Sequence, residues 1–551
     1  MDNPASTPLS VRFPSFRRLF TWRVLRRILI VLAWGATIVA LFYGEENWRG
    51  RRAWNNYRRE LEARGEPFDL KSFIPKPVPD EQNFAMTPLL APLFDFEPGT
   101  QHRRDSNGWD RAMSDPPRHE AAASAIKRPE ATVGDWSRGR KLDLVAWQRA
   151  YAQPTNPSTR QSINPIPDTP AGEREDRATA AAAVLEALRE CDPMLEELRA
   201  ASRRPYSRFN LRYDEENPAG ILLPHLAVLK RWVTILQLRA AAELALGKTE
   251  PALEDIRFSF RLIDAVREEP TLISFLVRVS EVRLALQPIW EGMAEGRWSA
   301  GQLEAIQQAL QRFDFLGDAK RGLQAECIGL GNGIMEYLRR WPSQAHELVG
   351  LDEARAHPNA TDLAAHVLAW GPRGWLYQEQ VEYDRLFDRF ILPPVDTVAS
   401  RVRSDLSSSN RAALDGLLAG DALQLLKAHR VFSTVLLPSL PNIHIKAAEG
   451  QAWVDVAVVA CALERYRLAT NQYPEMLDAL APRFIEKLPH DVISGQPLKY
   501  RREEGGRFVL YSVGWNEKDD GGAYPPKRIE RSERPFGKPN PDDGDWVWRY
   551  P

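Results

Sequence analysis

The feature that most constrains this chain is a run without charged side chains near its start, from Ile28 to Gly44. As a helix it would span about 25 Å, at 1.5 Å per residue. The span grows to about 30 Å if Val24 and Leu25 join it while Arg26 and Arg27 reach back to the interface. The run therefore predicts a transmembrane helix over residues 28–44.

Two other interpretations of this run are weaker. A cleaved signal peptide would carry small residues at a cleavage site after the apolar run, and the stretch from Ala40 to Gly44 has no A-x-A pattern. A buried core helix usually has polar residues along one face, whereas this run is apolar all round. An uncleaved membrane anchor is the prediction that we favour.

Arginines flank the run on both sides and bear on its orientation. Six precede it within residues 1–27, and five follow it between Arg49 and Arg59. Because positive residues tend to stay on the cytoplasmic side, this small excess favours a cytoplasmic N-terminus. We therefore predict a single-pass protein of the inner (cytoplasmic) membrane, with an extracytoplasmic body.

Composition limits the possible partners and the compartment only loosely. The chain has 551 residues, a length typical of two to four units, and a net charge of −1. No global field would therefore attract nucleic acid, and we expect no nucleic-acid partner. The three cysteines, Cys191, Cys327 and Cys461, form neither a disulfide framework nor a zinc motif, so we expect them in the core.

Proline distribution and hydrophobic periodicity divide the chain into regions. Fourteen of the 42 prolines lie between Lys71 and Ala180, so we expect an extended segment there, with a flexible linker at 156–175. The predicted regions are a basic segment at 1–27, the transmembrane helix at 28–44, a juxtamembrane helix at 45–70, the proline-rich segment at 71–178, a helical body at 179–445, a C-terminal module at 446–522 and a tail at 523–551.

Helical periodicity dominates the predicted body. From Leu226 to Leu246, apolar residues recur at intervals of three and four, and Gly247 then ends the helix. Ser299 and Gln302 form a capping box for another helix. Further helices are expected over 363–392 and 412–435. The turn at 240–256 is similar to a tetratricopeptide turn but has no second copy, so a bundle and a solenoid both stay open.

The last hundred residues carry a second kind of pattern. An apolar helix is expected from Gln451 to Thr470, followed by strands at 498–502 and 507–513 with a Gly505-Gly506 turn between them. The predicted fold is thus mainly α. It has an N-terminal transmembrane helix, an α-helical bundle or solenoid-like body, and a small α+β C-terminal module with a short β-hairpin.

Four motifs follow one another within residues 451–522: LERYRLATNQYP, LPHD, SGQPLKY and LYSVG. In this order they resemble the C-terminal half of the major (G-type) pseudopilin of type II secretion systems. The resemblance implies an extracytoplasmic C-terminus and an interaction role. The membrane run begins Arg27-Ile28-Leu29-Ile30 and lacks the glutamate of a pilin peptidase site, so we expect no polymerisation.

The whole chain is also similar to large uncharacterised bacterial single-pass membrane proteins that end in a segment like 545–551, DWVWRYP. Pseudopilins of this kind hold calcium in the acidic loop after their last strands. The matching residues are Asp519 and Asp520, with oxygens of Ser512 or Asn516 as further ligands. Calcium requires six to eight oxygens, and a solvated turn is the alternative interpretation.

Common catalytic motifs are missing from the sequence. It contains no GxxxxGK[ST], GxSxG or HExxH, and the glycine-rich stretch from Gly329 to Gly333 favours a helix break or close helix packing over a dinucleotide loop. We therefore expect a non-enzymatic structural or interaction component of the cell envelope. Its expected partners are membrane lipid and envelope or secretion proteins. The alternative is an envelope-associated hydrolase whose site forms only in the fold.

Overall fold

The computed structural model describes residues 22–97, 100, 102–126, 133–153, 176–213, 215–344, 367–522 and 544–549. Within these ranges the protein is mainly helical, with two small antiparallel sheets, and the predicted fold class is confirmed. Most of the predicted basic segment, the linker at 156–175 and most of the tail lie outside the described residues.

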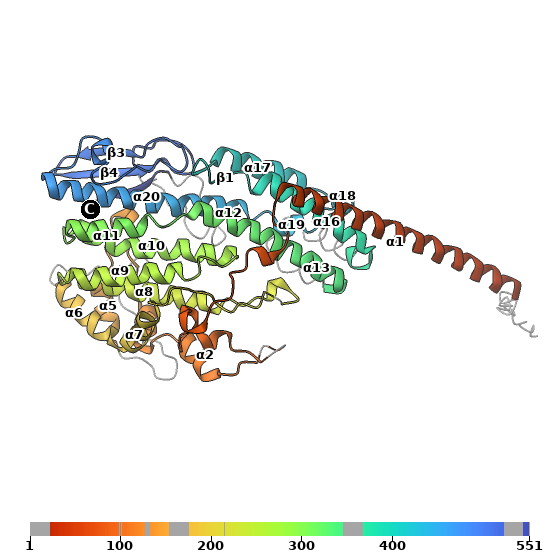
Figure 1. The fold of residues 1–551 in the computed structure, drawn as a ribbon, viewed down its shortest axis with the longest axis horizontal. Coiled ribbons are helices and arrows are strands. Elements are labelled where there is room, and N and C mark those ends of the chain that lie inside the picture. Colours follow the sequence, from red (N-terminus) through yellow and green to blue (C-terminus); the bar gives the residue numbers. More distant parts are fainter. Residues whose placement is uncertain are drawn as a thin grey trace, which may run out of the picture.

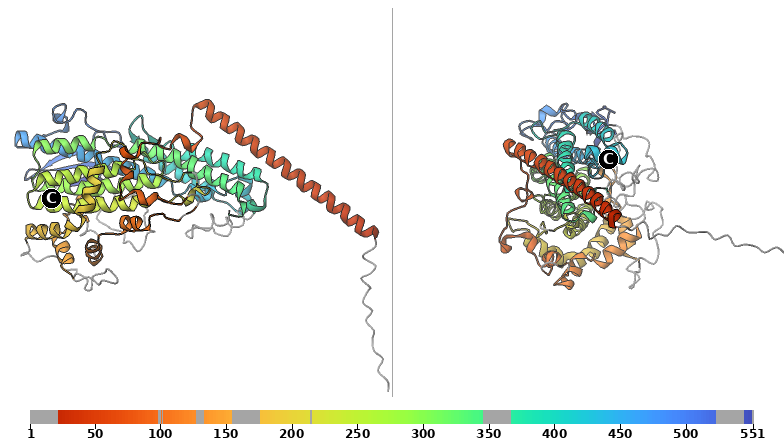
Figure 2. Two further views of the ribbon diagram at one scale, coloured as in Figure 1. Left: turned by 60° about the horizontal axis from the view of Figure 1, so that its bottom comes forward. Right: turned by 90° about the vertical axis from the view of Figure 1, so that its right-hand side faces the viewer.

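A single long helix, α1 (Trp22–Arg64), begins the described chain. Its first half projects obliquely away from one end of the body, while its second half lies against the body (Figures 1 and 2). The predicted membrane and juxtamembrane helices are thus one continuous element. It ends at Arg64 instead of Leu70, because Gly65 adopts a left-handed φ of 69° that stops the helix.

Among the described residues, two helical segments are long and apolar enough to cross a membrane: α1 and residues Pro218–Ala245. A signal sequence near the N-terminus can have the same length and apolar composition as the first half of α1. The second segment contains α8 (Pro224–Ala245), most of which is buried, as in the core of a soluble protein. In the apolar run of α1, by contrast, no residue is buried inside the protein.

The proline-rich region is more ordered than an extended segment. It contains α2 (Ser106–Met113), α3 (Pro117–Ala125) and α5 (Leu144–Tyr151), along with several single 3-10 turns. Asp105 and Asp143 cap two of these helices, and Pro117 begins the third. The stretches between prolines are long enough for such capped helices of eight or nine residues. Proline content alone does not reveal that these helices form.

The body is a set of helices that lie roughly alongside one another (Figure 1). Predicted start signals are found in place, including the capping box of Ser299 and Gln302. The helices are α6 (Arg177–Ala187), α7 (Asp192–Ala201), α8, α9 (Thr249–Asp264), α10 (Leu272–Ala294), α11 (Ala300–Leu310), α12 (Phe315–Glu326), α13 (Gly333–Arg340), α16 (Arg373–Leu386), α17 (Ser404–Leu418), α18 (Ala422–Ala428) and α19 (Ser433–Leu436).

The C-terminal module is built into the body. Its helix, α20 (Pro441–Thr470), begins ten residues before the predicted Gln451 and packs against α10, α11 and α12. The predicted hairpin forms from β3 (Lys499–Glu503) and β4 (Arg507–Ser512), in antiparallel register with Lys499 opposite Tyr511. A third strand that we did not predict, β5 (Trp546–Arg549), completes the sheet on the other side of β4. A separate two-residue pair, β1 (Val395–Asp396) and β2 (Arg401–Val402), precedes α17.

One hydrophobic core runs through most of the body and the sheet. Three smaller clusters lie apart from it: one around Met335 and Phe432, one of Tyr57, Leu61 and Val381, and one of Val509, Tyr511 and Val547 in the sheet. All three cysteines are buried and free, as predicted. Part of the packing at the end from which α1 projects is therefore separate from the main core, although Tyr383 and Leu386 of α16 belong to it.

Candidate functional site

A cavity of about 480 Å³ opens between the end of α1, the α12–α13 helix and α16. Tyr57 and Arg64 of α1 form one wall, and Asp384 and Asp388 of α16 and the segment after it form another. Cavities of this size commonly hold small molecules or the side chains of a partner. Four of its lining residues carry the polar chemistry that we consider here: Asp384, Asp388, Cys327 and Asn332.

A widened helical turn, η9 (Cys327–Asn332), joins α12 to α13 as a π-helix. The glycine-rich stretch expected to allow close packing lies here. A Cβ atom on Gly331 would come within 2.3 Å of the Tyr383 ring, so only glycine lets α16 approach this closely. The helical interpretation of residues 329–333 is confirmed, and it places Cys327 and Asn332 beside the cavity.

The facing helix also ends in a π-helical turn, η11 (Phe387–Ile391), which follows α16 directly. A π-helical turn inserts an extra residue and rotates the side chains that follow, and such turns are frequent at functional sites. Here it carries Asp388 into the cavity wall. Two π-helical segments far apart in sequence thus border one cavity.

Asp384 is a strongly perturbed carboxyl group in this site. Its carboxylate accepts hydrogen bonds from the Cys327 thiol at 3.4 Å and from the Asn332 amide at 3.3 Å. Burial raises the pKa of Asp384 to about 8, and the nearby Asp388 charge adds to the increase. At neutral pH this carboxyl is therefore mainly protonated, and it offers the cavity an uncharged acid.

Asp388 is more open to solvent and has partners from α1. The Tyr57 hydroxyl donates to its Oδ2 at 3.1 Å, and an Arg64 nitrogen lies 3.6 Å from the same oxygen. Burial, together with the Asp384 and Asp388 charges, raises the pKa of Tyr57, which keeps its hydroxyl a donor. The site therefore joins α1 to α16 through polar contacts as well as packing.

Cys327 does not have the character of a nucleophile here. Burial and the adjacent Asp384 raise its pKa well above the usual value for a thiol, so the sulfur stays protonated. Among the described residues that line the cavity, neither histidine nor serine is present to act with it. The arrangement can donate and accept hydrogen bonds and can transfer a proton, but it does not present an activated nucleophile.

A second cavity of about 720 Å³ shares Phe68, Ile328 and Asn332 with the first. It extends along α1 past Trp54 and Arg58, and it reaches Glu326, whose pKa burial raises to about 7. The two cavities together form a partly apolar hollow along the second half of α1. A peptide or helix of a partner would have room there to contact both α1 and the body.

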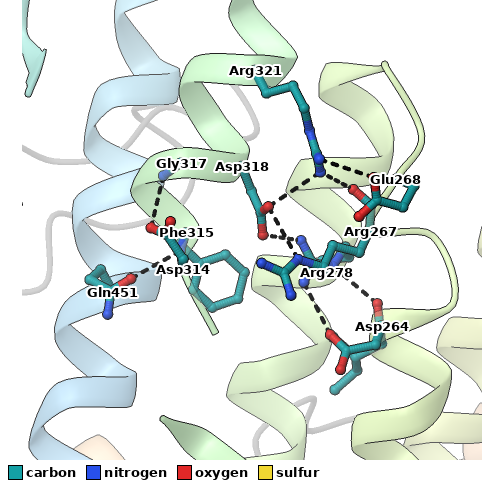
Figure 3. Close-up of polar contacts among 11 residues, drawn as sticks. Asp264, Arg267, Glu268, Arg278, Asp314, Phe315, Gly317, Asp318, Arg321 and Gln451 are labelled. Carbon is teal, nitrogen blue, oxygen red and sulfur yellow. Dashed lines mark hydrogen bonds and ion pairs between the residues drawn. The ribbon is translucent and has the colours of Figure 1, made fainter. Parts of the chain in front are cut away.

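A second buried polar cluster, around Arg278, differs in that its charges are paired (Figure 3). Arg278 bonds to Asp318 at 2.5 Å and to Asp264 at 3.3 Å, and its Nε donates to the Ile263 carbonyl at 3.0 Å. These bonds connect α9, α10 and α12 within the main core. We interpret this cluster as structural, because the Arg278 side chain is nearly inaccessible to solvent.

The predicted calcium residues have other partners in this structure. Asp519 accepts a hydrogen bond from the Tyr511 hydroxyl at 2.8 Å and pairs with the Lys499 ammonium at 3.2 Å, while Asn516 donates to Asp520. Ser512 is buried and donates to Asp491 at 3.0 Å. Donors that surround a carboxylate compete with a cation, so this arrangement does not fit a calcium shell.

Within the described residues, no group of three or more His, Cys, Asp or Glu side chains is placed to hold a metal ion. Calcium at Asp519 and Asp520 stays a prediction, and it would require Lys499 to move away.

The module's motif residues hold its parts together. Asp491, from the LPHD motif, accepts from the Ser512 hydroxyl and from the Val513 amide at 2.9 Å, which ties the turn before β3 to the end of β4. Tyr473, in the NQYP motif, donates to the buried Glu464 of α20. Asp491 and Tyr473 therefore make internal connections of the module.

Sequence reasoning missed the residues of the cavity. The available signals were the spacing of four between Asp384 and Asp388, and the glycine-rich stretch that ends beside Asn332. Neither signal indicates that helices over fifty residues apart in sequence would meet at Asp384.

Comparison with known proteins adds no relative. The chain matches no protein-family model, and no curated protein and no solved structure matches it. The likeness to a pseudopilin therefore rests on the motifs given above.

Proposed function

We propose that this chain is a membrane-anchored, non-enzymatic interaction protein of the cell envelope. In this proposal α1 spans the cytoplasmic membrane once, with its N-terminus in the cytoplasm and its body outside. The hollow along the second half of α1 receives a partner from the envelope. The pseudopilin-like motifs favour a partner from a secretion system, and that link rests on the resemblance alone.

The observation that carries the proposal is the dual character of α1. Its apolar side chains are exposed, with Val31 at 69% and Ile38 at 63% exposure, and burying such a run requires lipid or another apolar environment. The same helix continues unbroken, and its second half packs against α16. A signal peptide would end at a cleavage site after the apolar run, whereas here the chain is helical on both sides of Gly44.

Close contacts hold the second half of α1 in place on the body. Asn47 accepts a hydrogen bond from the Gly374 amide at 2.7 Å, and Gly50 lies against the Gly374 backbone so closely that a Cβ would overlap it. Glu46 accepts from the Trp375 indole at 3.1 Å. A fixed junction of this kind supports a body held in one orientation to the membrane.

The interaction role can be tested at the hollow. A photocrosslinking amino acid in place of Phe68, which lines both cavities, should capture one defined envelope protein in intact cells. The same group in place of Leu468, an exposed residue at the far end of α20, serves as the control and should not capture it. Equal capture at both positions, or none at either, would contradict a partner bound in the hollow.

One observation favours a hydrolase as a second candidate. The cavity holds two carboxyl groups in different surroundings, with Asp384 protonated near neutral pH, and such a pair can supply an acid and a base. Asp384→Asn should fold, because an amide resembles a neutral carboxyl. We expect the full chain and this variant to show the same background rate of hydrolysis with chromogenic esters, glycosides and phosphate esters. Turnover that depends on Asp384 would favour the hydrolase.

A further inference from the structure

The end of the body nearest the apolar half of α1 contacts that helix at the predicted edge of the bilayer. The Tyr43 hydroxyl donates to the Trp370 carbonyl at 2.5 Å, and the Phe42 ring meets the Trp375 ring edge-on at 6.1 Å. Tyr43 is the last residue but one of the uncharged run. Trp370 therefore lies at the depth where α1 passes from lipid to water.

Trp370 is unusually open for so large an apolar residue. Its side chain is 83% exposed, although the adjoining Leu368 is buried. Val367, one helical turn before it, is also partly exposed, and Trp341 at the end of α13 is about half exposed. Tryptophan is enriched at membrane interfaces because its ring combines an apolar body with a polar N–H group.

Exposed arginines lie on the helices at this end of the body. Arg373 donates to the carbonyl of Arg339, which places the start of α16 beside the end of α13, and both Arg373 and Arg340 are exposed. On α1, Arg52 lies over the Trp48 ring at 5.2 Å. The acids Glu46, Glu216 and Glu336 pair with Arg49, Arg340 and Arg339. Against the exposed Glu45, the remaining Arg51, Arg52 and Arg373 leave a positive excess.

We propose that this end of the body is a second membrane contact, in which Trp370 and Val367 enter the headgroup–acyl boundary of the bilayer that α1 spans. Arg373 and Arg52 bind anionic lipid headgroups beside them. The inference rests on the proposed membrane anchor. The second contact would place the body directly on the membrane surface, instead of leaving it connected to the membrane through a flexible linker.

The contact can be measured by the depth of a probe at position 370. The native cysteines are all buried, so a fluorescent nitrobenzoxadiazole (NBD) label on Trp370→Cys can be introduced selectively into the folded full chain. Labels on Ala36→Cys, in the apolar run, and on Val398→Cys, in the exposed β1–β2 turn, are the matched references. Each labelled protein is reconstituted in phosphatidylcholine–phosphatidylglycerol vesicles that contain lipids with a nitroxide quencher high on the acyl chain.

We expect the nitroxide lipids to quench the fluorescence of NBD at positions 36 and 370 and to leave the fluorescence at position 398 unchanged. If position 370 behaved like 398 while position 36 was quenched, the second contact would be refuted and the anchor kept. If position 36 was not quenched, the anchor itself would fail, and the second contact with it. Vesicles of phosphatidylcholine alone should quench position 370 less, and equal quenching would refute the role of the arginines.

Discussion

The two ends of the molecule are held together differently. At the end distant from the apolar half of α1, the helices α8 to α11, α20 and the sheet share one continuous core, and Arg278 on α10 is buried with its charge paired. At the end from which α1 projects, two small clusters around Tyr57 and Met335 lie apart from this core, whereas Tyr383 and Leu386 of α16 belong to it. Two cavities and the protonated Asp384 lie at the same end.

The difference predicts unequal local stability. A continuous core supplies most of the stability of a domain, whereas regions packed in small clusters open at lower cost. We therefore expect the distal end to open last and the end from which α1 projects to open first. Each prediction below tests one side of this contrast.

The largest effect is expected in the distal core. Replacing Arg278 with Ala leaves Asp318 buried with less compensation, and breaking a buried ion pair in this way costs about 3 kcal/mol of unfolding free energy. Urea denaturation followed by circular dichroism measures it. Arg189→Ala, which removes an exposed pair with Glu186, should cost less than about 1 kcal/mol. Equal costs for the two variants would contradict a paired, structural role for Arg278.

The next largest effect is expected from a substitution at the contact between α1 and α16. A Cβ at Gly374 would come within 1.9 Å of the Glu46 carbonyl, so Gly374→Leu should separate the helices at a cost of about 2 kcal/mol. Hydrogen exchange should then rise in α16 and in residues 45–64 while α8 to α11 stay protected. Gly416→Leu, at an open position of α17, is the control. Exchange rising throughout the body would show that the two ends are not independent.

The proximal acid should make stability depend on pH. The pKa of Asp384 is about 8 in the folded state and near 3.8 when unfolded, so the folded state binds the extra proton between these values. Its contribution is complete below the unfolded pKa and is lost as pH rises through the folded pKa. Between pH 6 and pH 7, the wild type should therefore lose about 1 kcal/mol more than Asp384→Asn. Urea titrations at the two pH values measure the difference, and parallel losses would mean that Asp384 is ionised.

The smallest effect concerns the acidic loop of the C-terminal module. Because Lys499 and Tyr511 already contact Asp519, we expect calcium to leave the thermal midpoint of the full chain unchanged. Asp519→Asn should lower the unfolding free energy by less than about 1 kcal/mol, since its ion pair is exposed. A calcium-dependent rise in the midpoint that disappears in Asp519→Asn would confirm the calcium site predicted from the sequence.

Local patterns predicted the elements of the fold well. The apolar run predicted the first half of α1, Ser299 and Gln302 predicted the start of α11, and the Gly505-Gly506 pair predicted the hairpin, where both glycines adopt positive φ. Each signal depends on neighbouring residues, which the sequence shows directly. The strand β5 escaped prediction, because its pairing with β4 spans more than thirty residues of intervening chain.

The cavity could not be predicted because its chemistry depends on distant contacts. Asp384 is one of many acids in the sequence, and its pKa is raised by burial between helices, although hydrogen bonds from Cys327 and Asn332 partly offset the increase. The glycine-rich stretch indicated close packing without naming Tyr383 as the neighbour. Proline content predicted an extended segment, whereas buried residues such as Phe84 and Leu93 attach the proline-rich region to the main core.

The most direct test of the account is the fate of residues 28–44 in the native protein. Membranes should be washed with alkaline carbonate, and the intact mass and N-terminal sequence of the protein then determined. The account predicts that the protein stays in the membrane pellet with Ile28–Gly44 still attached. A product that begins after Gly44 and is released by carbonate would contradict it.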